Sequence, residues 1–467
     1  MEKSMTSGNS LKLLLTFMIP LIIGNIFQQM YSISDIIIVG RTIGVNALAS
    51  VGAAAPIFML LVMVTMGLSN GLNVLTGQFF GARDLDTMRR SVAMSLRICV
   101  IAVLILAVGM HIIIDPLLRL MNLPEILYQD TRSYILIVAE GLWAMMAYNF
   151  FSAVLRALGD SKTPVYFLVF ATIINVGLAL LFILKFGLGV PGSAYALVMA
   201  QGLSAFLCAI YMWKHFPILR LKKSDWGWDT RFAISPLKMG LPMAGQFSIL
   251  GVGILLIQSI TNSFGPNTIA GFTAAIRVEQ LALQPMASFG IAMAAFSAQN
   301  FGAKQFQRIR DAVKKCSLIA MAFAFCAGIL IFFFSENIIG IFIEEGNPDV
   351  VKHALLYLNC SVPFYFFLSQ MFIYRSAVQG MGVGMVPLAS SLIELSMRVG
   401  VAKFLATDWG WGFRGVCYAS PVAWVAGSFF LFFAYHYFIR LFERLYRKKK
   451  YLTNFFSFHI IYLILIL

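Results

Sequence analysis

The sequence predicts an all-α membrane protein in which twelve transmembrane helices form two six-helix bundles, related by pseudo-two-fold symmetry along the membrane normal. Three observations lead to this fold class: the composition, the length of the apolar segments and an internal repeat. The chain is 60% hydrophobic and 12% charged, whereas soluble domains carry roughly 25% charged residues. This composition is typical of a membrane protein.

At least twelve apolar segments are long enough to cross a bilayer core, which takes about 20 helical residues. Closed β-barrels also satisfy every backbone group in lipid, but their strands are alternating segments of about ten residues, and these runs are longer. The first run is too long for a signal-peptide core and lacks a small-residue cleavage site, so it is expected to remain as the first helix. The segments lie near residues 11–39, 44–76, 91–114, 132–155, 163–186, 190–213, 236–262, 267–298, 316–340, 351–379, 385–406 and 412–438.

Short motifs occur twice in the same order, about 222 residues apart. A repeat of this length predicts two halves with six helices each in the same orientation. The repeated pairs are residues 78–83 with 299–304, 187–196 with 410–419, Pro20 with Pro242, and Pro164 with Pro387.

The repeat divides the chain into an N-terminal six-helix lobe at 1–222 and a C-terminal six-helix lobe at 223–450. One chain contains both halves, so a monomer is expected to form the whole assembly. The apolar tail at 451–467 is too short to span a bilayer, so it either lies at the interface or is an aberrant end of the reading frame.

Basic residues gather in the loops after the second, fourth, sixth and eighth segments and in the C-terminal tail, whereas the loops after the third and ninth segments are acidic or mixed. The positive-inside rule then places both termini in the cytoplasm of a prokaryote, on a multi-pass plasma-membrane protein. The net charge of +15 reflects this topology. Nucleic-acid binding is not predicted, because the basic residues lie in short loops between spans.

Residues that would indicate an enzyme are scattered. The five histidines show no metal-ligand spacing and the six cysteines form no CxxC pair, so inert buried thiols, no metal and no cofactor are expected. Residues 187–192 and 410–415 match the dinucleotide fingerprint G-x-G-x-x-G in form only, since they join two apolar segments with no strand before them. Tight turns and close helix packing are expected there.

One face of the first segment carries polar residues at membrane depth. Asn25, Gln28, Ser32 and Asp35 follow one another at spacings of three and four, which places them on one helical face. Interhelical hydrogen bonds, worth about 1 kcal/mol each, would explain the first three. A carboxylate costs roughly 3 kcal/mol or more at this depth, so Asp35 is the main functional candidate, with a solvated position near the outer interface as the alternative. Pro20 removes a backbone hydrogen bond and predicts either a hinge or a static kink.

Three further acids inside the apolar segments are candidates for lining a substrate cavity. Glu140 has no local partner in the sequence, and Glu279 lies close to Arg277. Glu394 precedes Arg398 by four residues, a spacing that fits either a buried self-neutralising pair or a functional role.

The ordered set of these features resembles the multidrug and toxic compound extrusion (MATE) family over about residues 10–440, and within it the DNA-damage-inducible-type branch. The set comprises the two six-helix halves, Pro20 and Asp35 followed by Val39-Gly40, the Gly-Ala-Arg/Lys loops, and Asn175. The resemblance implies a central cavity and the export of cationic or amphipathic drugs and toxic compounds in exchange for H⁺ or Na⁺, by alternating access.

A flippase for lipid-linked oligosaccharides or lipids, from the same superfamily, is the alternative. A polyprenyl-pyrophosphate would require several arginines or lysines in the cavity, and the segments contain chiefly Arg97, Arg277, Arg375 and Arg398.

The resemblance also assigns a cation-coupling site. In the family, the first lobe combines a helix 1 Asp, a helix 5 Asn with an Asp four residues later, and a helix 6 Thr. Asp35 and Asn175 match, whereas Ala179 replaces the second acid and Leu197 the threonine. Hard cations generally need several oxygen ligands, but a proton needs one carboxylate. H⁺ is therefore expected as the coupling ion in preference to Na⁺.

Overall fold

The computed structural model describes residues 4–121, 123–227, 229–340 and 348–451, with the side chains of residues 30–37, 231 and 448–451 outside the described part. These residues are nearly all helical. Eleven of the described helices are long and apolar enough to cross a membrane, and one bent pair supplies a twelfth crossing. This agrees with the twelve predicted spans.

The helices of the first half are α1 (Ser10–Thr42), α2 (Val45–Gly81), α3 (Leu85–Leu120), α4 (Glu125–Glu140), α5 (Leu142–Ala157), α6 (Lys162–Leu180) and α7 (Gly189–His215). Those of the second half are α8 (Thr230–Asn262), α9 (Pro266–Gly302), α10 (Phe306–Gly340), α11 (Pro348–Ser361), α12 (Tyr365–Gly380), α13 (Met385–Lys403) and α14 (Phe413–Tyr451). Short 3₁₀ turns lie at Pro217–Leu219, Lys223–Trp226 and Val362–Phe364, and π-helical turns at Leu181–Lys185 and Phe404–Asp408.

Two of the predicted segments are interrupted near the middle of the crossing. The fourth crossing consists of α4 and α5, which meet at 46°. A Cβ on Gly141, between them, would lie 2.2 Å from Cγ2 of Val198 in α7, so the lack of a side chain at this position allows α7 to pack closely against the break. The tenth crossing consists of α11 and α12, joined by the turn Val362–Phe364. Sequence periodicity does not show these breaks, because apolar residues continue through them.

The backbone repeats its irregular features in both halves. A π-helical turn follows α6 and another follows α13. The first two glycines in each of the motifs at 187–192 and 410–415 have φ between +56° and +70°, a region that glycine adopts readily. A Cβ on Gly415 would lie 2.5 Å from the backbone nitrogen of Ala406. These motifs are turns and close-packing positions, as the sequence predicted.

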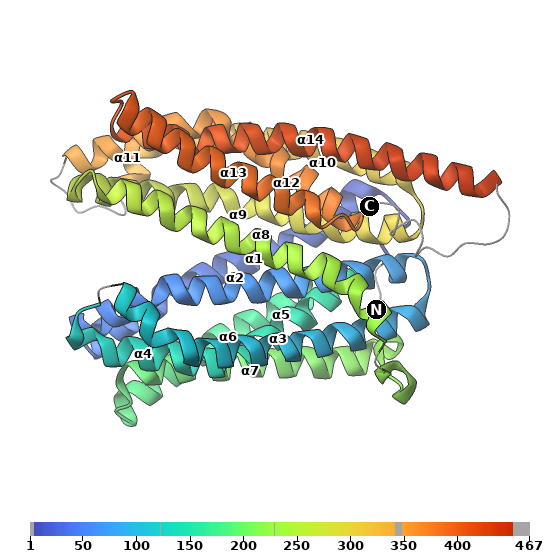
Figure 1. Ribbon diagram of the computed structural model, residues 1–467, viewed down its shortest axis with the longest axis horizontal. Helices are drawn as coiled ribbons and strands as arrows, with labels where there is room; N and C mark the ends of the chain where they lie inside the picture. Colours follow the sequence, from blue (N-terminus) through green and yellow to red (C-terminus); the bar gives the residue numbers. More distant parts are fainter. Residues whose placement is uncertain (1–3, 122, 228, 341–347, 452–467) are drawn as a thin grey trace.

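The first helix of each half lies between the two lobes. Figure 1 shows one lobe containing α3 to α7, the other containing α9 to α14, and α8 running diagonally between them. α8 packs against α13 and against α2, whose side chains belong to the buried core of the first lobe, and α1 packs against α6 and α9. Each of these helices therefore contacts both lobes. The predicted boundary between residues 222 and 223 falls in the connection between α7 and α8.

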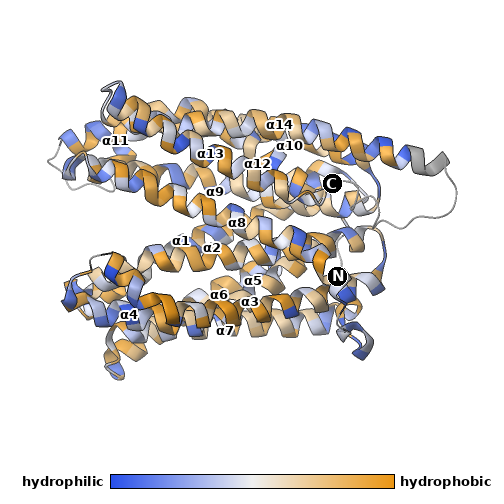
Figure 2. Cartoon of the chain, viewed as in Figure 1, coloured by the Kyte–Doolittle hydropathy of each residue, from blue (hydrophilic) through white to orange (hydrophobic). Residues whose placement is uncertain are grey.

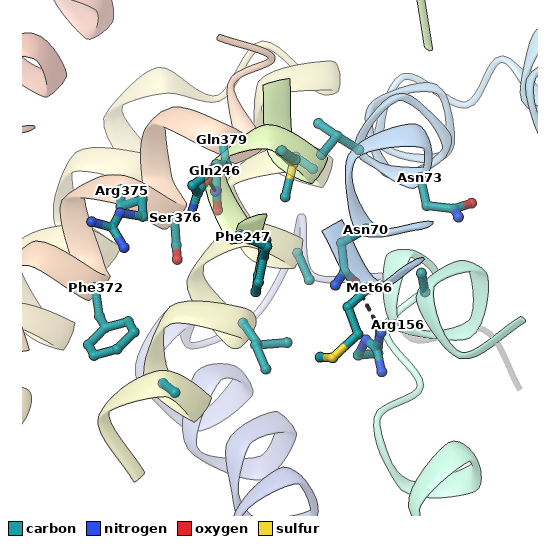
Figure 3. A pocket seen from close by; sticks show the side chains of 18 of the residues that line it. Met66, Asn70, Asn73, Arg156, Gln246, Phe247, Phe372, Arg375, Ser376 and Gln379 are labelled. Atoms are coloured by element: carbon teal, nitrogen blue, oxygen red, sulfur yellow. Dashed lines mark hydrogen bonds between the residues drawn. The ribbon is translucent and has the colours of Figure 1, made fainter. Parts of the chain in front are cut away.

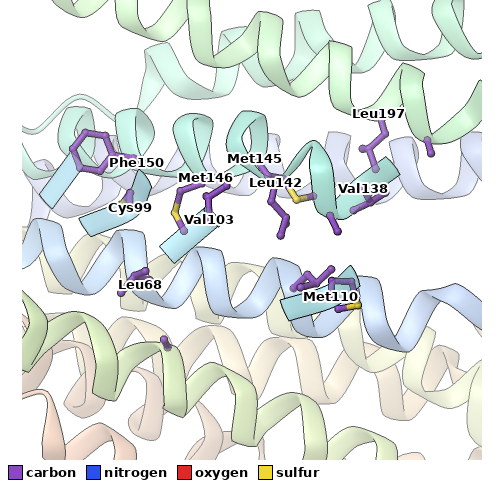
Figure 4. Packing of buried hydrophobic residues seen from close by; sticks show 14 of the residues in the cluster. Leu68, Cys99, Val103, Met110, Val138, Leu142, Met145, Met146, Phe150 and Leu197 are labelled. Carbon is purple, nitrogen blue, oxygen red and sulfur yellow. The ribbon is translucent and has the colours of Figure 1, made fainter. Parts of the chain in front are cut away.

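Apolar side chains fill the lobes and cover their outer faces. In the first lobe, Met145, Met146 and Phe150 of α5 belong to one buried cluster with residues of α2, α3 and α7 (Figure 4). Hydrophobic residues extend along the helices, and hydrophilic residues gather towards the two ends of the bundle (Figure 2). Five cysteines are buried as expected, but Cys326 is exposed, because it lies on the outer face of α10 near the exposed Phe325.

The two halves approach most closely where α2 and α9 end. A Cβ on Gly81 would lie 1.9 Å from the carbonyl oxygen of Gln299, and one on Gly302 would lie 1.8 Å from the carbonyl oxygen of Gln78. Small residues allow helix backbones to approach in this way. We call this region, residues 78–81 and 299–302, the closed end.

Replacing Gly302 with alanine should force α2 and α9 apart and lower the thermal unfolding temperature of the purified protein in detergent. Gly177→Ala is the matched control, because it lies within helix α6 and nothing surrounds its Cβ position within 4 Å. Alanine favours a helix over glycine by roughly 0.5–1 kcal/mol, so this variant should match or exceed the parent. Equal unfolding temperatures for the two variants would contradict the close contact.

Candidate functional site: a cavity between the two lobes

A cavity of about 360 Å³ lies between the two lobes, within the usual size range of small-molecule sites. Helices α1, α2 and α5 line it from the first half, and α8, α9 and α12 from the second. Its polar and cationic lining residues are Asn25, Gln28, Asn70, Asn73, Arg156, Gln246, Gln284, Arg375, Ser376 and Gln379, and its larger apolar ones are Met66, Met243, Phe247, Leu250, Ile291 and Phe372.

None of the described residues that line this cavity is acidic, and two are arginines. Figure 3 shows Arg156 and Arg375 on opposite sides, with Phe247 between them. The guanidinium of Arg156 donates to Oδ1 of Asn70 at 3.1 Å. Among the described residues, no carboxylate forms an ion pair with Arg156.

Arg375, in contrast, is neutralised inside the second lobe. Its guanidinium forms an ion pair with Glu394 of α13, and the two side chains are 5% and 2% exposed. Ser390 donates to the same carboxylate oxygen at 2.9 Å. The local spacing had suggested Arg398 as the partner. The structure corrects this, because α12 brings Arg375 against Glu394, and the buried Nε of Arg398 has no hydrogen-bond partner among the described residues.

Two equivalent glutamines hold the closed end together. Nε2 of Gln78, from α2, donates to the carbonyl oxygen of Gly380 at 2.8 Å, and Nε2 of Gln299, from α9, donates to that of Ala157 at 2.8 Å. These carbonyls belong to the last residues of α12 and α5, where a helix leaves its carbonyls without internal partners. Each half therefore caps a helix of the other half directly beside the cavity. Met5 adds its backbone N–H, which donates to Oε1 of Gln299 at 2.7 Å.

A second cavity of about 90 Å³ lies inside the first lobe. Gln28 lines both cavities. Asn175 is 1% exposed, and its Nδ2 has no partner among the described residues. The remaining lining residues are Phe58, Val62, Met145, Leu168, Ala171, Thr172, Leu197, Ala200 and Gln201.

Family comparison identifies this arrangement. The MatE family model matches the chain twice, over residues 20–181 and 242–402, once in each half. The chain belongs to the MATE family. Members of this family are transporters, so the protein is a membrane transporter and not an enzyme, as the sequence predicted. Its assignment to one branch of the family stays a prediction.

Two relatives from Bacillus subtilis (strain 168) cover nearly the whole MATE chain. The probable multidrug resistance protein YpnP is 30% identical over 441 residues, 92% of this chain and 96% of the relative. The probable multidrug resistance protein YoeA is 28% identical over 446 residues, 94% of each chain. A crystal structure of a MATE protein in the bent conformation matches with a TM-score of 0.88 at 22% identity, over 94% of this chain and 98% of that one. The predicted fold class is confirmed.

The structure places the predicted polar residues of α1 in different settings. Asn25 lines the central cavity and donates to Oγ of Ser288 in α9 at 3.3 Å, which links α1 to the second lobe. Residues 32 and 35 lie in α1, but the side chains of Ser32 and Asp35 are outside the described part. α1 continues through Pro20 without a break.

The predicted acids do not converge on the cavity. Glu140 lies at the end of α4, where its 63% exposed side chain contacts His111 at 3.2 Å. Glu279 is buried in the second lobe, where the hydroxyl of Tyr357 donates to it at 3.1 Å. Neither lines the central cavity, and Glu394 reaches it only through Arg375.

Sequence reasoning missed Arg156 as a site residue. The predicted segment ended at residue 155, so this arginine counted as a loop charge, whereas α5 continues to Ala157. Asn70 and Asn73, three residues apart in an apolar segment, were also missed. Amide side chains at helical spacing inside a long apolar run were the available signal.

Replacing Glu394 with alanine should destabilise the MATE fold strongly, because the buried guanidinium of Arg375 would lose its partner, at a cost of roughly 3–5 kcal/mol. Unfolding in detergent measures this loss. The double variant Glu394→Gln/Arg375→Gln removes both charges and should recover much of the stability. Glu140→Ala is the matched control at an exposed acid, and a loss as large there would refute the special role of the buried pair.

Proposed function

We propose that this transporter is a secondary active antiporter that exports amphipathic drugs and toxic compounds across the plasma membrane of a prokaryote in exchange for H⁺. The central observation is a cavity lined by both halves and closed at one end by two equivalent glutamine contacts. The names of both Bacillus subtilis relatives, probable multidrug resistance proteins, support this substrate class.

The closed end suits alternating access. It lies where α2 and α9 end, beside the basic loops that the positive-inside rule places in the cytoplasm. The cavity would then be closed toward the cytoplasm in this state. The two amide-to-carbonyl hydrogen bonds contribute about 1 kcal/mol each, so rocking of the lobes can exchange them for hydrogen bonds to water. Helices α1 and α8, which contact both lobes, would guide this motion.

Proton coupling at Asp35 and Asn175 is the mechanism we favour. The second acid and the threonine of the family's cation site are replaced by Ala179 and Leu197, which removes two of the oxygen ligands that Na⁺ would use, whereas a proton needs only the carboxylate of Asp35. Protonation would neutralise Asp35 and reduce the cost of burying it in the membrane. Because α1 also packs against α9, repacking of α1, with Pro20 as a bending point, would reach the second lobe.

Lipid-linked oligosaccharide transport is less well supported. A pyrophosphate would require several cations in the cavity, but Arg375 is paired with Glu394. Arg97 lies over the ring of Trp226, 5.2 Å from its centroid, and Arg277 is exposed. A cavity of about 360 Å³ also suits a drug-sized molecule.

Asp35→Asn should abolish gradient-driven export while leaving folded protein in the membrane, since an amide cannot be protonated and deprotonated in this cycle. The measurement is dye transport in proteoliposomes with the pH gradient and the Na⁺ gradient imposed separately. Cationic, anionic and uncharged amphipathic dyes should be compared.

Asp349→Asn, at an exposed acid in the first turn of α11, is the matched control and should retain transport. Undiminished pH-driven transport by Asp35→Asn would refute the coupling role. Transport driven by Na⁺ alone would refute the choice of ion.

A further inference from the structure

We propose that the central cavity selects amphipathic compounds that carry an anionic group, and that Arg156 is the residue that holds this group. This inference rests on the proposed export function and specifies its substrate class. The cationic compounds that the family resemblance suggested would then be the poorer substrates.

The charge balance of the cavity wall favours an anion. Its described lining residues include two arginines and no acid, and Arg375 is neutralised by Glu394. Arg156 is left with an amide partner, Asn70, in place of a carboxylate. Charges interact strongly in a medium of low dielectric constant. A cationic substrate would therefore meet a like charge in this cavity, whereas an anionic one would supply the missing counter-charge.

Asp35 is poorly placed to supply that counter-charge. Residue 35 lies ten residues beyond Asn25 in α1, about 15 Å of helix. Asn25 itself lines the cavity, whereas Arg156 lies in the last turn of α5. The carbonyl of the next residue, Ala157, accepts the hydrogen bond from Gln299. Arg156 therefore lines the cavity at its closed end.

The geometry of Arg156 suits an oxyanion. A guanidinium offers five N–H donors in a planar fork that matches a carboxylate, sulfonate or phosphate. One nitrogen donates to Asn70 (dashed line in Figure 3), which fixes the orientation of the side chain. The side chain is only partly buried, so its remaining donors can reach a ligand in the cavity.

The rest of the cavity suits the apolar body of such a compound. Phe247 and Phe372 present aromatic rings, and Met66 adds a flexible thioether. Gln246 and Gln379 contact each other in the cavity wall, since Nε2 of Gln379 donates to Oε1 of Gln246 at 2.8 Å. The ligand class is therefore a drug-sized aromatic anion with its charged group at the closed end.

The test compares two dyes with the same ring system and opposite charge. Fluorescein carries a carboxylate and tetramethylrhodamine methyl ester is cationic, and both fluoresce, so their binding to the full-length protein in nanodiscs can be followed by polarisation. The parent protein should bind fluorescein more tightly. Arg156→Gln should weaken fluorescein binding about tenfold or more, as expected for the loss of a charged hydrogen bond, and should leave the rhodamine unchanged or bound more tightly.

Two further variants test whether a change in binding comes from loss of folding or from a change in net charge alone. Arg156→Lys retains the charge but loses the fork, so its affinity for fluorescein should fall between those of the parent and Arg156→Gln. Arg97→Gln removes an arginine that lies over Trp226 outside the cavity lining, and should change neither affinity. Tighter rhodamine binding by the parent, or fluorescein binding that is insensitive to both Arg156 variants, would overturn the proposal.

Transport of the same dyes separates this proposal from the export function. If proteoliposomes export the rhodamine under a gradient but not fluorescein, export stands and the anionic preference fails. If fluorescein binding depends on Arg156 but neither dye moves under any gradient, the anion site stands and the export function fails.

Discussion

The contact between the ends of α2 and α9 is the constraint on which the rest of the structure depends. In lipid, a helix satisfies its backbone groups internally, so hydrogen bonds between two helical lobes must come from side chains or from the free backbone groups at helix ends. The contacts of Gln78 and Gln299 combine the two, because each side-chain amide donates to the terminal carbonyl of a helix in the opposite half. Gly81 and Gly302 allow the approach that brings these groups together. The cavity forms because the two lobes are in contact at the closed end and lie apart next to it.

The crossing helices connect this contact to the interior of the first lobe. α1 packs against α6 in its own half and against α9 in the other, and Gln28 lines both cavities. A change of charge or packing in the small cavity would therefore be transmitted to the central one through a single helix. Asn25, which donates to Ser288 of α9, provides a direct polar link along this route.

The scaffold is duplicated, but the charged groups beside the central cavity are not. The π-helical turns, the left-handed glycines and the closed-end glutamines occur in both halves. The buried pair Arg375–Glu394 is found only in the second half, where its equivalents in the first would be Ser152 and Ala171. Arg156 corresponds to Gln379 in the second half. Symmetry thus sets the shape of the cavity, and substitutions at single positions set its charge.

The sequence by itself determined the membrane class, the twelve crossings, the duplication and the family. Every helix that crosses a bilayer must show a long apolar run, and a duplicated fold shows its motifs twice along the chain. The sequence also determined that residues 187–192 and 410–415 are turns. Only the tertiary structure decided that Glu394 pairs with Arg375 in place of Arg398, since four-residue spacing makes a pair possible but the neighbouring helix selects the partner. It also decided that Arg156 faces the cavity, because the direction of a side chain at the end of a span depends on how the two lobes close.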